Sequence, residues 1–173
     1  MSADDLRAKI REIPDFPKPG ILFYDITTLL KDGPAFREAV ELMTERYRGT
    51  QVDAVVGMES RGFIFSAPMA AELGAGFVPV RKLGKLPAET LSVEYALEYG
   101  TNTLEIHKDA ITPGQKVLVV DDLLATGGTV VGTLELLKLL KAEVVGLAFL
   151  IELLFLKGRD RLRDQRIHSV IQY

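Results

Sequence analysis

The hydrophobic positions along the chain form two kinds of pattern, compact apolar runs and repeats at helical spacing. Short apolar runs, typical of strands buried on both faces, predict strands at residues 52–58, 76–80, 116–122 and 143–153. Apolar residues at helical spacing predict helices at 3–13, 34–48, 63–73 and 129–141. Strands that alternate with helices predict an α/β fold in which helices cover both faces of a parallel sheet.

Residues 82–115 interrupt this alternation with a strand period. Apolar side chains occupy every second position, at Leu91, Val93, Tyr95, Leu97 and Tyr99, and again at Leu104 and Ile106. The turn-like "EYGTN" lies near the middle, so we predict a β-hairpin inserted between two strands of the sheet. Such sheets bind ligands at the carboxyl ends of their strands, which favours a flap over a binding site. A purely structural hairpin or a dimer arm is the alternative.

Composition narrows the class of protein. The chain has 173 residues, 47% of them hydrophobic, which suits one compact domain with a sizeable core. The net charge of −3 argues against nucleic acid as the main partner. There is no cysteine, which excludes disulfides, thiol nucleophiles and thiolate metal sites. The charged N-terminus lacks a signal-peptide pattern, and the apolar stretch 144–156 is too short to span a bilayer, so we expect a cytoplasmic protein without a membrane partner.

A glycine-containing loop follows the strand at 116–122, within the stretch "VLVVDDLLATGGTVV" (117–131). Gly127 and Gly128 allow the backbone to approach a ligand closely. The N–H groups of the loop and of the following helix can then donate to a phosphate. Thr126 and Thr129 add hydroxyl groups, and either side chain could cap the helix. The spacing of the glycines matches neither a Walker A loop nor the dinucleotide fingerprint.

Two adjacent carboxylates, Asp121 and Asp122, precede this loop and should repel a phosphate. Carboxylates accept hydrogen bonds from hydroxyl groups, and a ribose presents two adjacent hydroxyls. A sugar phosphate therefore satisfies both halves of the motif, with the phosphate on the loop and the diol against the acids. Direct metal binding by the acids, or an ordinary strand-to-helix turn with incidental acids, are the alternatives.

This stretch resembles the signature of the type I phosphoribosyltransferases, which bind 5-phosphoribosyl 1-pyrophosphate (PRPP). The resemblance implies a parallel-core sheet with helices on both faces, an N-terminal hood and an inserted hairpin flap. It implies one domain over 1–173, with the hood at 1–33 and the flap at 82–115. It also implies that the ribose and its 5′-phosphate bind to Asp121, Asp122, Ala125, Thr126, Gly127, Gly128 and Thr129.

Other segments are similar to the members of this family that use adenine. They are "DFPKPGILFYDIT" (15–27), "ESRGFIF" (59–65), "VRKLGKLP" (80–87), "LEYGTNTLEIHKDAI" (97–111) and "LIELLFLKGR" (150–159). The resemblance places pyrophosphate at Ser60 and Arg61, with Lys82 and Lys85 as further candidates. Arg61 can make bidentate contacts to phosphate oxygens. A run of basic residues is usually a solvated face, but Arg81, Lys82 and Lys85 begin at the ligand edge of the sheet, where a pyrophosphate needs neutralising. Glu59, an acid within the loop, is not expected to touch the anion.

The same resemblance assigns the base site. It places Phe23 in a stack on adenine, Ile21 or Leu22 in backbone contacts with the purine edge, and Leu153 on the other face of the base. Glu98 is expected to assist proton transfer as the catalytic residue, and Tyr99 to help close the flap. By composition alone, Phe23 and Leu153 would be ordinary core residues, and Glu98 a solvent-facing glutamate.

The resemblance therefore implies an enzyme that converts adenine and PRPP to AMP and pyrophosphate. Mg²⁺ is the expected cofactor, held mainly by substrate oxygens rather than by protein ligands. The family is usually dimeric, and the apolar "LLFL" (153–156) could serve an interface or the core. A phosphoribosyltransferase for xanthine or hypoxanthine is the nearest alternative. A non-catalytic PRPP-sensing regulator of nucleic acid is the second, disfavoured by the net charge of −3.

Overall fold

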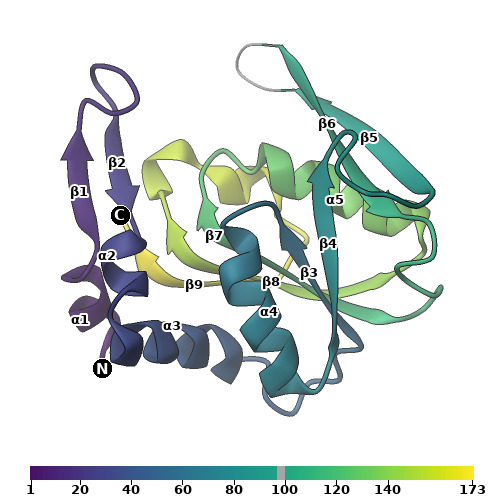
Figure 1. Cartoon of the computed structure of the whole chain (residues 1–173), viewed down its shortest axis with the longest axis horizontal. Coiled ribbons are helices and arrows are strands. Elements are labelled where there is room, and N and C mark those ends of the chain that lie inside the picture. The colour runs from purple at the N-terminus through teal and green to yellow at the C-terminus, as the bar shows by residue number, and fades with distance from the viewer. Residues whose placement is uncertain (97–99) are drawn as a thin grey trace.

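A computed structural model describes residues 1–96 and 100–173. In this part of the chain, seven strands form one sheet in the order β5-β6-β4-β3-β7-β8-β9 (Figure 1). The five strands at its parallel centre and edge are β3 (Ala54–Met58), β4 (Gly76–Lys82), β7 (Lys116–Leu124), β8 (Glu143–Glu152) and β9 (Ile167–Gln172). The predicted α/β fold with a parallel central sheet is confirmed.

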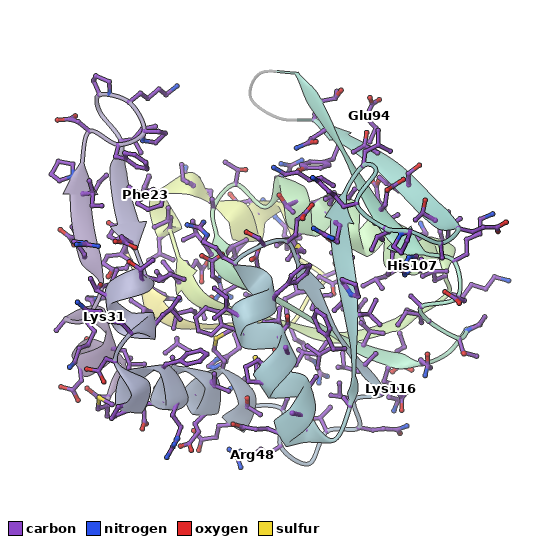
Figure 2. All side chains as sticks on the ribbon, viewed as in Figure 1. Phe23, Lys31, Arg48, Glu94, His107 and Lys116 are labelled. Atoms are coloured by element: carbon purple, nitrogen blue, oxygen red, sulfur yellow. The ribbon has the colours of Figure 1, made fainter. Side chains whose placement is uncertain are left out.

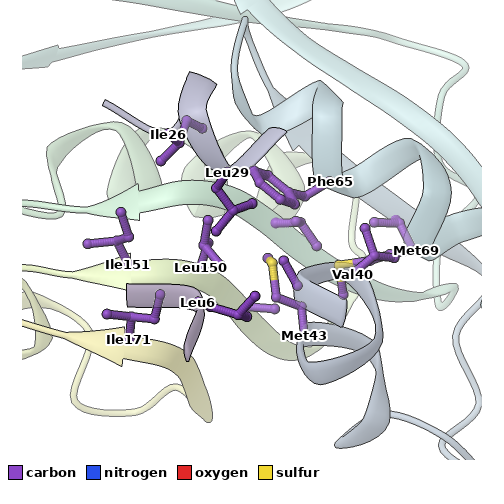
Figure 3. Close-up of a cluster of buried hydrophobic side chains, with 14 of the residues drawn as sticks. Leu6, Ile26, Leu29, Val40, Met43, Phe65, Met69, Leu150, Ile151 and Ile171 are labelled. Carbon is purple, nitrogen blue, oxygen red and sulfur yellow. The ribbon is translucent and has the colours of Figure 1, made fainter. Parts of the chain in front are cut away.

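Helices pack on both faces of this sheet, as the apolar runs predict. On one face lie α1 (Ala3–Arg7), α2 (Thr27–Leu30), α3 (Gly33–Glu45) and α4 (Gly62–Leu73), whose buried side chains surround Phe65 and Met43 (Figure 3). The other face is covered by α5 (Gly128–Leu139) together with the hairpin. Successive side chains of a strand point to opposite faces of the sheet. Val55 therefore packs in the core on the side of α1 to α4, and Val56 packs in the core on the side of α5 and the hairpin. Alternation across a strand thus fills two cores with one apolar run.

The inserted hairpin consists of β5 (Thr90–Ala96) and β6 (Thr101–His107), which pair antiparallel over their whole length. The hairpin is joined to the parallel strands through β4, where Arg81 pairs with Glu105 and Lys82 with Leu104. The hairpin projects past the parallel strands at the upper right of Figure 1. This agrees with the predicted hairpin in 82–115, although residues 97–99 lie outside the described residues.

The predicted helix at 3–13 is wrong in its second half. Helix α1 ends at Arg7, and residues Arg11–Pro14 form β1, which pairs antiparallel with β2 (Leu22–Asp25). Leu6 and Ile10 are buried as the helical spacing predicts, but Ile13 lies opposite Phe23 in this separate two-stranded ladder. Three periodic residues are compatible with one helical turn followed by a strand. Pairing with β2, which lies across the proline-containing turn, favoured the strand.

The C-terminal segment completes the sheet. Two short 3₁₀ turns, η1 (Leu154–Leu156) and η2 (Gly158–Arg161), follow β8 and lead to the edge strand β9. The sequence patterns predict no element here, because β9 is short and only Ile171 in it is fully buried. No helix within the described ranges is long and apolar enough to cross a membrane.

Candidate active site

The predicted binding loops all follow strands of the parallel centre. Residues 59–61 follow β3, 83–85 follow β4, 125–127 follow β7 and Leu153 follows β8. Since these four strands are parallel neighbours, the loops meet at one edge of the sheet. Figure 2 shows Phe23, on β2, on one side of this edge and Glu94, on the hairpin, on the other. The topology therefore brings residues that lie far apart in sequence to a common edge.

The acid pair lies in the last residues of β7. Asp122 is buried, at 4% exposure, and its Oδ2 lies 2.9 Å from Nε of Arg61. The Asp122 amide donates to Oδ1 of Asp121 at 2.9 Å. Burial, followed by the charge of Asp122, raises the pKa of Asp121 well above its usual value, and burial also raises the pKa of Asp122 despite the opposing charge of Arg61. The pair therefore resists carrying two full negative charges, which weakens its repulsion of a nearby phosphate.

A glycine allows the two neighbouring loops to approach each other. A Cβ atom at Gly62 would lie 2.8 Å from Oδ1 of Asp121 and 3.2 Å from the carbonyl oxygen of Val120. Helix α4 therefore begins directly against the end of β7, with Arg61 as its N-terminal flanking residue. This close approach explains why Arg61, predicted for pyrophosphate, contacts Asp122, predicted for ribose.

The predicted phosphate loop leads directly into α5. Gly127 occupies the N-cap position with φ of 82° and makes no side-chain cap. Contrary to one expectation, neither Thr126 nor Thr129 caps this helix. A left-handed glycine at the cap turns the backbone without a capping side chain, so the first N–H groups of α5 stay available to an anion. Gly127 and Gly128 are themselves buried, and Thr126 is exposed.

Glu59 connects the two candidate pyrophosphate loops. Its carboxylate accepts from Nε and Nη2 of Arg81 at 3.1 and 3.0 Å and from the backbone N–H of Lys82 at 2.6 Å. Burial opposes its ionisation, but these hydrogen bonds dominate and the pKa of Glu59 is lowered. The Glu59–Ser60 peptide bond is cis. An acid that organises a basic loop from the neighbouring strand has no sequence signature, so this role was not predicted.

The candidate cations of this region are not equivalent. Arg81 is engaged by Glu59 and also donates to the carbonyl oxygen of Lys85 at 3.2 Å, so it holds the loop in shape. The side chains of Lys82 and Lys85 are exposed, as is Ser60. The amide of Gly84, between the two lysines, donates to Glu105 on β6 at 2.9 Å. Two carboxylates thus fix the backbone that carries the exposed lysines.

The candidate base site is built on β2. The ring of Phe23 is half-buried, packs edge-to-face on Phe16 at 5.1 Å between centroids, and lies 5.7 Å from the guanidinium carbon of Arg61. The N–H of Ile21 donates to Lys18, and its carbonyl accepts from Phe16. Pro14, opposite Leu22 in the ladder, has no N–H to donate. Both backbone groups of Ile21 are therefore already hydrogen-bonded, whereas the carbonyl of Leu22 faces a residue without an N–H. Of the two residues predicted to contact the adenine edge through the backbone, the structure favours Leu22.

Two contacts attach the N-terminal segment to the C-terminus, one from β2 and one from α1. Tyr24 stacks on Tyr173 at 4.0 Å between centroids, and the guanidinium of Arg7 lies 5.0 Å from the Tyr173 ring. Leu153, predicted for the far face of the base, is buried and donates its N–H to the carbonyl of Leu124 at 3.0 Å. Glu98 and Tyr99, predicted for proton transfer and flap closure, lie outside the described residues.

Potential metal ligands are sparse at this edge. Among residues 1–96 and 100–173, no group of three or more His, Cys, Asp or Glu side chains is arranged to hold a metal ion. The carboxylates at this edge include the Asp121–Asp122 pair, in which Asp122 already pairs with Arg61, and Glu59, which already accepts from Arg81 and Lys82. Such a donor set fits a metal that takes most of its ligands from a substrate and water.

Comparison with known proteins identifies the family. Residues 26–172 match the model of the phosphoribosyl transferase domain. An adenine phosphoribosyltransferase of Chloroflexus aurantiacus is 59% identical over the full length of both chains. Among solved structures, the adenine phosphoribosyltransferase of Thermoanaerobacter pseudethanolicus has 53% identity and a TM-score of 0.96 over 99% of this chain and 100% of that one. The Saccharomyces cerevisiae enzyme, solved with adenine and an imino-altritol bisphosphate, has 39% identity and a TM-score of 0.92 over 97% of each chain. The chain therefore belongs to the phosphoribosyltransferase family and, within it, to the adenine phosphoribosyltransferases.

Proposed function

We propose that the protein transfers the phosphoribosyl group of PRPP to adenine, giving AMP and pyrophosphate in purine salvage. The observation that carries this proposal is the meeting of the acid pair, the uncapped N-terminus of α5 and the Arg61 loop at one sheet edge. One PRPP molecule presents a diol, a 5′-phosphate and a pyrophosphate. These three groups correspond to the three features.

In this proposal the ribose hydroxyls donate to Asp121 and Asp122, and the 5′-phosphate accepts from the loop Ala125 to Thr129. Ser60 and Arg61, with Lys82 and Lys85 as further cations, bind the pyrophosphate. Asp122 then exchanges its Arg61 partner for ribose, which frees the guanidinium for the leaving group. The arrangement thus uses one ion pair to keep both subsites preformed.

Adenine binds against Phe23, with Leu22 at its edge and Leu153 on the other side. N9 attacks C1′ as the bond from C1′ to pyrophosphate breaks, so that C1′ is inverted and N9 loses its proton. The role of Glu98 is to assist that proton transfer. Fixed donors on the departing pyrophosphate stabilise the charge that develops as the bond breaks. Exclusion of water by the hairpin protects C1′ from hydrolysis.

Mg²⁺ is the proposed cofactor. Bound mainly by PRPP oxygens, it would neutralise charge on the pyrophosphate, and Asp121 or Asp122 would be its nearest protein acids. We also propose a homodimer, since Leu154, Phe155 and Leu156 expose 49%, 66% and 37% of their surface beside the site. A cytoplasmic location fits a phosphorylated substrate that cannot cross a bilayer unaided.

The test incubates the protein with labelled adenine, PRPP and Mg²⁺ and separates the nucleotides. We expect AMP and an equal amount of pyrophosphate, with neither formed when PRPP is left out. A protein that binds PRPP but forms no nucleotide would contradict the proposal. Specific binding of nucleic acid by such a protein would favour the regulator instead.

A further inference from the structure

A buried acid at the end of β8 has no part in the reaction proposed above. Glu152 is 2% exposed, and its Oε1 lies 2.5 Å from Nε of Arg159, while Oε2 accepts from Nη2 of Arg159 at 2.7 Å. Ser169 and Gln172 of β9 donate to the same Oε2 at 2.7 and 3.3 Å. Burial opposes ionisation of Glu152, but these hydrogen bonds dominate and lower its pKa. This carboxylate is fully engaged, and it ties the turn after β8 to the edge strand.

The turn that Arg159 anchors forms a wall of the phosphate loop. A Cβ atom on its neighbour Gly158 would lie 2.4 Å from the carbonyl oxygen of Ala125, and one on Gly127 would lie 3.1 Å from the carbonyl oxygen of Gly158. A Cβ at Gly128 would lie 3.5 Å from Nη1 of Arg161 in the same turn. Backbone therefore packs directly on backbone here. A small movement of η2 must displace the loop, because close-packed groups leave no space to absorb it.

Glu152 is also joined to the base side of the site. It directly precedes Leu153, and its carbonyl oxygen accepts from the N–H of Tyr173 at 3.0 Å. Tyr173 in turn stacks on Tyr24 of β2, the neighbour of Phe23. Glu152 thus lies between two parts of the site. Its side chain contacts Arg159, the neighbour of Gly158, on the side of the phosphate loop. Its backbone joins Leu153 and Tyr173, and its side chain also accepts from Ser169 and Gln172 in the strand that leads to Tyr173, on the side of the candidate adenine contacts.

We propose that Glu152 and Arg159 are positioning residues that fix the phosphate loop relative to the adenine-binding residues. This role rests on the proposed function of both regions. Burial of the Glu152 carboxylate costs solvation that its contact with the half-exposed Arg159 has to offset, so we expect the pair to fix one geometry rather than to add much net stability. The two hydrogen bonds from the guanidinium to Glu152 fix the orientation of the Arg159 side chain and therefore the position of the neighbouring Gly158. A lysine at this position would make a single contact, which does not fix the orientation.

The experiment compares Glu152→Gln, Arg159→Lys and Gly158→Ala with the wild type. Gly158→Ala displaces the phosphate loop directly and defines the kinetic signature of that displacement. Glu72→Gln is the matched control, because Glu72 pairs with Arg48 at 3.5 Å on an exposed surface at the bottom of Figure 2, away from the site. The measurements are kcat, the KM of PRPP and of adenine, the Kd of ribose 5-phosphate by calorimetry, and the thermal midpoint.

We expect Glu152→Gln and Arg159→Lys to raise the KM of PRPP and the Kd of ribose 5-phosphate by about 2- to 30-fold. The KM of adenine should rise as well, and kcat should change less. Gly158→Ala should raise the KM of PRPP in the same way but change the KM of adenine less, because its added methyl group meets Ala125 of the phosphate loop and the adjoining Leu124. Glu72→Gln should match the wild type in all five quantities.

Wild-type KM and Kd values in a folded Glu152→Gln or Arg159→Lys variant would overturn the proposal, as would a lower thermal midpoint as the only change. If Glu152→Gln does not fold, Arg159→Lys decides, since its half-exposed side chain keeps its charge. Failure of the proposed function is separate, because the wild type itself would then form no AMP. Binding of ribose 5-phosphate would still report on the phosphate loop.

Discussion

At the residue scale, the sequence places the acid pair near the end of a buried strand but does not indicate its ion-pair partner. Asp121 and Asp122 lie near the end of β7, a position that follows from the apolar run before them. Their contact with Arg61 depends on Gly62, whose missing Cβ lets two strand-to-helix turns touch. Glu59 is a similar case, since its bond to Arg81 joins neighbouring strands that are distant in sequence. Such side-chain contacts can be predicted only when the order of the strands in the sheet is known, and hydrophobic patterns do not provide that order.

Asp122→Ala tests the ribose assignment. The variant loses a charge-assisted hydrogen bond to the ribose, so the KM of PRPP should rise by about 10- to 150-fold, equivalent to about 1.5–3 kcal/mol. Steady-state kinetics at saturating adenine would measure it, with Asp109→Ala as a matched acid on the exposed surface beyond β6. An Asp122→Ala enzyme with the PRPP kinetics of the wild type would remove Asp122 from the ribose site.

At the element scale, β3, β4, β7, β8 and the main helices follow from the apolar pattern, whereas the edge strand β9 and the hood do not. Residues 11–14 pair with 22–25 across a proline-rich turn, so their structure depends on a contact that local periodicity cannot indicate. Within the hood, Asp25 joins the β1–β2 ladder to α2, since its carboxylate accepts from Arg11 and from the N–H and hydroxyl of Thr27. The bonds from Thr27, followed by that from Arg11, lower the pKa of Asp25 to about 2.

Asp25→Asn should therefore destabilise the protein in a pH-dependent way. A carboxyl whose pKa is lowered on folding stabilises the folded state above its unfolded-state value of 3.8, and this stabilisation is lost as the pH falls towards about 2. Thermal unfolding at pH 7, 4 and 3 should show the largest gap between wild type and variant at pH 7 and a narrowing gap below pH 4. An equal gap at all three values would show that the charge of Asp25 does not stabilise the hood.

At the scale of the whole molecule, the apolar surface at η1 has no partner within the described chain. Leu154 and Phe155 are exposed although they follow the fully buried end of β8. From the sequence alone, the segment "LLFL" could belong either to an interface or to the core. In the structure Leu153 belongs to the core, and the next three residues are exposed.

Phe155→Glu should therefore weaken self-association. A charge in an apolar interface is costly to bury, so light scattering during gel filtration should show a shift from dimer to monomer. Leu139→Glu, at an apolar residue on α5 that is 57% exposed, is the matched control and should stay dimeric. A monomeric wild type, or a fully dimeric Phe155→Glu variant, would contradict the proposed interface.

The choice of base tests the central claim most directly. Competing labelled adenine, hypoxanthine, guanine and xanthine are supplied with PRPP and Mg²⁺, and kcat/KM is measured for each. A site that reads the purine edge through the backbone around Leu22 should prefer adenine by more than about 100-fold, because the wrong edge leaves buried polar groups unpaired. We expect AMP as the dominant nucleotide. An equal or higher kcat/KM for any of the other three bases would contradict the account.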